Sequence, residues 1–494
     1  MCTAPVEKLR VILLAIVLAA ASPIAPVHLP VSTQNPQAQT AFDRGLFLYY
    51  AYNGAAASRA FAQASNLDPT LAMAYWGVAL AAGPDLNTPP TEERVATGAR
   101  AIRRAVTLSS GLSPLERGLI AAMALRYRGS FANWNADNEA YRRAMSALVT
   151  STPDENVALL AAEALLEHGG LSWQDGRLVS ADSRDAMQLV ARVLHADPAN
   201  AMANHLCIHL YDLASDRAPA LPCAQRLDAA NFSPEAEHFA HMPAHYWIET
   251  GEYDAALRSS ERAFALMNQL PADGPDAEHT QQYDKHDITV GYSAAMMLGD
   301  YATAARWSQR MTAAFGADFD SLTALRFGRY DVAVAAGTDA FAAISVRGLA
   351  ALALGRISDA QSLAARMPAR SAASGYVSEL FLARLAESEG KYADANEFIG
   401  KALVNQREYF GGEQIPLIPA GEALGLLRMR HGDPNGAVAA FTETLALYPN
   451  DPRALFGLAE ALEGTGRAAD AAATMARFKK EWEGADTSVQ DALP

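Results

Sequence analysis

Seven of the eleven histidines in this chain lie between His205 and His286, and six of these form three short groups. The groups are His205 with His209, then His238 with His241 and His245, and finally His286. Neutral imidazole is the commonest metal ligand in proteins. Two histidines four residues apart lie on the same face of a helix, with about 5–6 Å between their Cβ atoms. If the three groups meet in the fold, the spacing predicts a metal site.

A repeated pattern of small, aromatic and proline residues predicts the elements that position these groups. At the N-terminal end the pattern, counted from Ala38, is Gly45, Ala57, Phe61, Ala64 and Pro69. Counted from Ile418 it is Gly425, Gly432, Ala437, Phe441 and Pro449. Small residues let two helices pack closely, and the proline ends the second helix. This spacing resembles the tetratricopeptide repeat, a helical hairpin of about 34 residues. We therefore expect an all-α fold, a superhelical solenoid of tetratricopeptide-type hairpins.

In this register, the three histidine groups fall on the first helices of three consecutive hairpins. The expected helices cover residues 201–214, 237–250 and 285–298. Their histidines occupy positions that line the inner, concave groove. Matching positions pair His205 with His241, His209 with His245, and His238 with His286. Adjacent helices lie about 8–10 Å apart, so a metal ion could bridge between their histidines.

Polar neighbours complete the predicted site. We expect Asp212 and Glu249 to orient ligand histidines from outside, and Tyr283 to position a substrate or take part in redox chemistry. Asp287, which follows the last ligand, is expected to point away from the groove. Pro243 lies inside the second histidine group and is expected to kink or restart that helix.

A site this rich in imidazole favours copper, with zinc or iron as alternatives. Six histidines could hold two metal ions with three ligands each, or one tetrahedral zinc with spare histidines around it. Two interpretations without metal also remain open. They are a hydrogen-bonded polar groove and a pH-sensing histidine cluster.

Composition limits the location and the partners. The formal net charge is −15 and no dense basic stripe is present, so nucleic acid is not an expected partner. Residues 1–22 resemble a signal peptide, with Lys8 and Arg10 before an apolar run; a retained anchor is the alternative. A periplasmic or secreted protein is expected, with no stable membrane span after cleavage. Cys207 and Cys223 could then form a disulfide, or Cys207 could be a buried apolar residue or a soft metal ligand.

The domain prediction follows from these segments. A signal peptide over 1–22 precedes a flexible lead-in over 23–39, which is rich in Pro, Ser, Thr and Gln. A single solenoid over 40–485 carries the histidine cluster at 201–298, and 486–494 form a tail. The oligomeric state is left open.

Three motifs carry a resemblance to a known family. They are NHLCIH (204–209), EHFAHMPAH (237–245) and YDKHD (283–287). They resemble the NHxxIH, HxxHMPxH and YxxHN elements of a family of bacterial secreted tetratricopeptide proteins. FDRGLFLYYAYN (42–53), AMAYWGVAL (72–80) and GPDLN (83–87) are similar to the first repeats of that family. The chain departs from the family at Gly54, where relatives tend to have histidine, and near Leu71 and Ala74, where they have cysteines. The resemblance implies no defined reaction.

Three functions are consistent with these residues. The first is a secreted metalloprotein with copper or zinc in the groove, in one form a copper-dependent oxidoreductase. The second is a protein-interaction scaffold without catalysis, in which the groove binds a peptide. The third is hydrolysis by zinc-bound water with Glu249 as the base, although HxxxH without an internal glutamate is not the zinc-protease motif. The expected ligand in the groove is a small molecule or a peptide.

Overall fold

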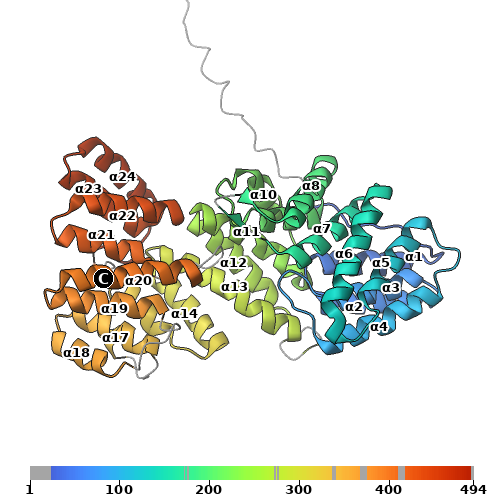
Figure 1. The fold of residues 1–494 in the computed structure, drawn as a ribbon, viewed down its shortest axis with the longest axis horizontal. Coiled ribbons are helices and arrows are strands. Elements are labelled where there is room, and N and C mark those ends of the chain that lie inside the picture. Colours follow the sequence, from blue (N-terminus) through green and yellow to red (C-terminus); the bar gives the residue numbers. More distant parts are fainter. Residues whose placement is uncertain are drawn as a thin grey trace, which may run out of the picture.

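The computed structural model describes residues 24–490, except for 172, 175–176, 272–273, 275–276, 336–340, 368–374 and 410–417. The predicted signal peptide over 1–22 and the end of the predicted tail, 491–494, lie outside the described residues. The predicted all-α solenoid is confirmed, because the described chain forms helices from α1 to α24 and one two-stranded hairpin. Figure 1 shows helices stacked along the long axis, with the first helices at one end and the last at the other. Among the described helices, none combines the length and the apolar character needed to cross a membrane.

The elements before the histidine cluster form the first part of the stack. They are α1 (Pro36–Tyr50), α2 (Gly54–Leu67), α3 (Ala72–Ala81), α4 (Glu92–Thr107), α5 (Pro114–Arg126), η1 (Phe131–Asn133), α6 (Trp134–Ser151), α7 (Glu155–Gly169), β1 (Trp173–Gln174), β2 (Arg177–Leu178) and α8 (Ala181–Ala196). The two strands are antiparallel.

The middle part carries the cluster. Its elements are α9 (Ala201–Tyr211), η2 (Ala218–Ala220), α10 (Leu221–Ala229), η3 (Pro234–Ala236), α11 (Glu237–Thr250), α12 (Tyr253–Met267) and α13 (Ala277–Met297). The last part consists of α14 (Tyr301–Phe315), α15 (Asp320–Arg326), α16 (Tyr330–Val334), α17 (Phe341–Ala353), α18 (Ile357–Ala365), α19 (Gly375–Ser388), α20 (Tyr392–Tyr409), α21 (Ala420–Arg430), α22 (Pro434–Leu447), α23 (Pro452–Gly464) and α24 (Ala468–Glu481).

The repeated small and aromatic residues pack as the sequence pattern predicts. The ring of Phe61 on α2 lies against Gly45 on α1 and Gly77 on α3, where an added Cβ would overlap the ring. Phe441 on α22 lies in the same way against Gly425 and Gly457. An aromatic ring from the second helix therefore fills the space that two glycines leave on the helices before and after it. This contact sets the close spacing of the stack.

The segment before α1 differs from the predicted flexible lead-in over 23–39. The Leu29 side chain is buried, and the backbone N–H of Ser32 donates to Glu116 Oε1 at 2.7 Å. Asn35 caps α1, which begins at Pro36. The segment is held because an apolar side chain and backbone donors find partners on α5 and α1, which its polar composition does not reveal. The other predicted domain boundaries stay predictions.

Contacts between residues distant in sequence join the first helices to the middle part of the stack. Phe47 of α1 packs on Phe239 of α11, with ring centroids 5.4 Å apart, and Arg44 pairs with Glu235 at 2.7 Å. The first hairpin therefore lies against the helix that carries three of the histidines.

Candidate metal centre

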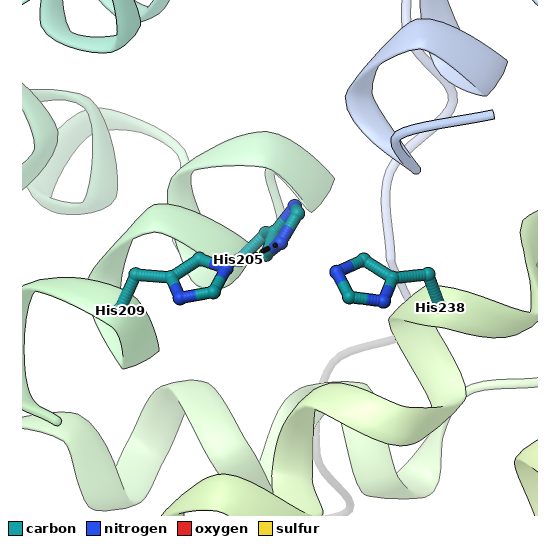
Figure 2. A group of neighbouring side chains, drawn as sticks. All are labelled: His205, His209 and His238. Atoms are coloured by element: carbon teal, nitrogen blue, oxygen red, sulfur yellow. Dashed lines mark hydrogen bonds between the residues drawn. The ribbon is translucent and has the colours of Figure 1, made fainter. Parts of the chain in front are cut away.

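The structure brings all six predicted histidines together in two groups. The first triad is His205, His209 and His238, and the second triad is His241, His245 and His286. In each triad, one ring nitrogen per residue lies within 4.8 Å of the others. Figure 2 shows the first triad, in which His238 on α11 faces His205 and His209 on α9.

The two triads are neighbours. The ring centroids of His209 and His245 are 6.0 Å apart, those of His238 and His241 are 5.7 Å apart, and those of His238 and His286 are 6.2 Å apart. The predicted contacts of His209 with His245 and of His238 with His286 are therefore present. The ring of His205, which was expected beside His241, packs instead on His238 at 5.0 Å.

Local sequence explains how α9 and α11 present these rings. Asn200 caps α9, because its side chain accepts the Ala203 N–H at 3.0 Å, and His205 and His209 follow one turn apart. α11 covers the predicted range 237–250. Of the two effects expected at Pro243, a restart is wrong, since α11 continues through the proline and is capped by Gly251 in the left-handed conformation; the kink stays a prediction. All three histidines of α11 thus share one helix.

The triads are buried, whereas the sequence predicted histidines that line an open groove. Five rings are 0–3% exposed, and only His286 of the six is partly exposed. Tyr52, in the turn after α1, covers the first triad, with its ring centroid 4.4 Å from His205 and 5.5 Å from His238. The difference arises because the first hairpin folds over helices about 150 residues further along the chain, and a repeat register does not encode this closure.

Hydrogen bonds fix the tautomers of His205 and His209 in the first triad. The Nδ1 of His205 lies 2.9 Å from the carbonyl oxygen of Tyr50, and the Nδ1 of His209 lies 3.4 Å from Asp212 Oδ2. A carbonyl and a carboxylate can only accept, so both Nδ1 atoms carry the proton. In neutral rings the Nε2 atoms then hold lone pairs. These two Nε2 atoms face each other at 3.1 Å.

The second triad repeats part of this arrangement. The Nε2 atoms of His245 and His286 face each other at 3.3 Å, and the Nδ1 of His241 lies 3.5 Å from Asp287 Oδ1. The expectation that Asp287 points away is wrong. Its side chain is buried and turned toward α11, because α13 packs with the edge formed by residues 286 and 287 against that helix. Asp212 and Asp287 therefore each lie beside the Nδ1 of one histidine, one in each triad.

Burial keeps four of the six rings neutral. Burial lowers the pKa of His205, His238, His241 and His245 well below the usual 6.5, and the neighbouring imidazoles lower it further. A neutral imidazole is the form that binds a metal ion.

The nitrogen spacing fits a bound metal. Two nitrogens about 2.0–2.1 Å from one ion, at an angle between square and tetrahedral, are about 2.9–3.4 Å apart. The two facing pairs, at 3.1 and 3.3 Å, fall in this range. In each triad, two of the three donors thus have the chemistry and separation that one ion requires, and the third lies within 4.8 Å of them.

Other predicted residues have different surroundings. Glu249, one turn beyond His245, pairs with Arg217 at 2.5 Å. Tyr283 lies in α13, but its side chain lies outside the described part of the chain. His279 is buried and bonded to Glu237 at 2.9 Å, because α13 begins at Ala277 rather than at 285.

Two features complete the surroundings. Cys207 and Cys223 form a disulfide that joins α9 to α10, so Cys207 is not a free metal ligand. Tyr50 and Tyr52 were missed as site residues, although they lie in the YYAYN segment at the end of the first predicted helix. Aromatic residues that continue past the end of α1 were the available signal.

Comparisons with known proteins find a match for part of the chain. The tetratricopeptide repeat profile matches residues 422–486, so the region from α21 to α24 contains tetratricopeptide repeats. No curated protein matches the sequence.

Solved structures with similar helices include a chain of the APC/C hetero-tetramer Cut9–Hcn1. The identity is 11%, with 80% of this chain and 77% of that chain covered and a TM-score of 0.37. The human IFIT1 dimer with m7Gppp-AAAA is similar at 14% identity, covering 91% of this chain and 96% of that chain, with a TM-score of 0.32. Neither similarity carries an argument about function.

Proposed function

We propose that this protein binds two metal ions, one in each histidine triad, and that copper is the preferred metal. One observation carries the proposal. In the first triad, acceptors hold the protons on both Nδ1 atoms, so two Nε2 lone pairs converge at 3.1 Å with no proton between them. Two lone pairs at this distance repel each other, and a cation between them removes the repulsion.

The donor set supports copper. All six donors are imidazole nitrogens, and the two nearby carboxylates lie on the outer Nδ1 side of the rings. Imidazole suits copper and zinc, and copper has the higher affinity at a given nitrogen site. Iron sites usually include a carboxylate ligand, so iron fits less well. Zinc with three histidines and one water remains the alternative.

The proposal extends to redox chemistry at the two metal ions. The disulfide between Cys207 and Cys223 supports an oxidising compartment, periplasmic or extracellular, as does the predicted signal peptide. In such a compartment, two adjacent copper ions could cycle between oxidation states, and the protein would act as a copper-dependent oxidoreductase. The resemblance to bacterial secreted tetratricopeptide proteins belongs to this same proposal.

Metal content tests the proposal. Full-length protein, stripped with chelator and reloaded with copper(II) or zinc(II), is expected to hold two ions per chain. His209→Ala and His245→Ala should each lower this to one. His168→Ala is the matched control, since His168 lies on α7 with a side chain 39% exposed. Native protein that retains no stoichiometric copper or zinc would overturn the proposal.

Absorption and electron paramagnetic resonance spectra identify the metal and its redox activity. Protein made in an oxidising compartment should contain copper(II) that a mild reductant converts to copper(I). A colourless protein with two zinc ions would show that zinc, and not copper, is the native metal. It would also exclude the proposed copper-dependent oxidoreductase.

A second candidate function is a protein-interaction scaffold, favoured by the tetratricopeptide repeats at 422–486. Repeats of this type stack into extended surfaces that bind partners. A partner captured by the full chain, with binding unaffected by chelator and by His245→Ala, would support the scaffold function.

A further inference from the structure

We infer that the two triads are unequal and that only the second one exchanges ligands with solvent. On the His286 side, it binds a small ligand of two or three atoms, such as azide or a diatomic molecule. This inference rests on the proposed function and adds to it the class of molecule that the centre accepts.

The first observation is the exposure of the rings. All three side chains of the first triad are 0–3% exposed, and so are His241 and His245 of the second triad. His286 alone is partly exposed. A molecule from solvent therefore reaches the centre by way of His286.

The second observation is the closure of the first triad by Tyr52. Its backbone has a φ of 58°, a left-handed conformation that is unfavourable for a non-glycine residue. The strained turn places the phenol ring against His205, His209 and His238, with centroid distances of 4.4, 6.2 and 5.5 Å. The Tyr52 ring thus covers the face of the first triad that a ligand would otherwise approach.

The third observation concerns size. The centre lies among rings only about 4.5–6.5 Å apart between centroids, and five of its six donors are buried. A bulky organic substrate cannot contact the metal without unpacking α11 from α9 and α13. A ligand of two or three atoms needs no such change.

Azide is the probe for this inference, because it binds copper(II) with a charge-transfer absorption band. The full-length protein is first loaded to two copper ions per chain, and azide is then titrated while absorption and electron paramagnetic resonance are recorded. We expect one azide per chain. His286→Ala, which removes one ligand of the second triad, should lower the copper content to one ion and lose the band. His209→Ala, which disables the first triad, should keep it.

A gain-of-function variant provides an independent test. Tyr52→Gly removes the covering ring and suits the left-handed backbone, so the first triad should open and azide binding should rise to two per chain. This variant tests the inference even if His286→Ala does not fold. One azide in Tyr52→Gly would show that Tyr52 does not close the first triad.

The remaining outcomes separate the two proposals. Two bound copper ions without azide binding would overturn this inference and leave the proposed function standing. An azide band that persists in His286→Ala and disappears in His209→Ala would show that the first triad exchanges ligands, and would overturn the inference. A protein that binds no metal would overturn both.

Discussion

The carboxylate beside the second triad offers a sharp test of how this site is built. The Asp287 carboxylate lies 3.5 Å from the Nδ1 of His241, as an ionic contact, and is buried. Asp287→Asn keeps the size of the side chain and an acceptor oxygen, and it removes one negative charge. Loss of such an outer partner typically costs about 10–100-fold in metal affinity.

The geometry places the expected loss at the lower end of that range. Charge-assisted N–H···O bonds are usually about 2.7–2.9 Å long, and the contact of Asp287 is longer. We therefore expect the dissociation constant of the second triad to rise about tenfold, which corresponds to about 1.4 kcal/mol. Asp212→Asn is the matched change at the first triad, where the distance is 3.4 Å, and it should act on that triad alone.

The assay needs one triad at a time. In a His209→Ala background only the second triad binds, and competition with a chromophoric chelator gives its dissociation constant with and without Asp287→Asn. The same substitution in a His245→Ala background should leave the first triad unchanged. An unchanged constant at the second triad, or an equal loss at both triads, would refute the assignment of Asp287 to His241.

Three further predictions concern stability, measured by urea denaturation of the metal-free protein. Burial raises the pKa of Glu163 well above the usual 4.5. The stability that its proton provides is therefore present below pH 4.5 and lost as pH rises. Glu163→Gln should add about 1–3 kcal/mol to the free energy of unfolding at about pH 8 and little at about pH 4.5. At Gly251, φ is +79° and an added Cβ would overlap the Pro449 carbonyl oxygen, so Gly251→Ala should cost about 3 kcal/mol or more. Gly355→Ala, with φ +71° and no atom within 4 Å of the added Cβ, should cost only about 1–2 kcal/mol. Cys223→Ala should cost about 2–4 kcal/mol by removing the disulfide, and the expectation fails if the midpoint does not change.

The repeat register predicted much of the architecture because it depends on contacts between successive helices. Glycines that accept an aromatic ring identify helix pairs, and the predicted range of α11 matches the structure. The same register gave the neighbours of His209 and His238 across helices. It could not give the start of α13, which begins eight residues before Lys285, because the segment before that residue carries no repeat signature.

The closure of the site was beyond sequence reasoning. Tyr50 and Tyr52 reach His205 across 155 and 153 residues of chain, and a pattern of local period does not say which distant turn covers a buried cluster. The prediction that Asp287 points away from the groove was wrong for a related reason. Helical spacing gives the angle between adjacent side chains, whereas the rotation of α13 against α11 depends on packing between whole helices.

The cover that Tyr52 provides has a consequence for fragments of this chain. A piece that begins after α2 would retain all six histidines and both carboxylates, and would still lack the wall that keeps water from the first triad. Such a fragment should bind metal in a wetter and more exchangeable way than the full chain. The N-terminal hairpin supplies no histidine, but it shields the first triad from solvent.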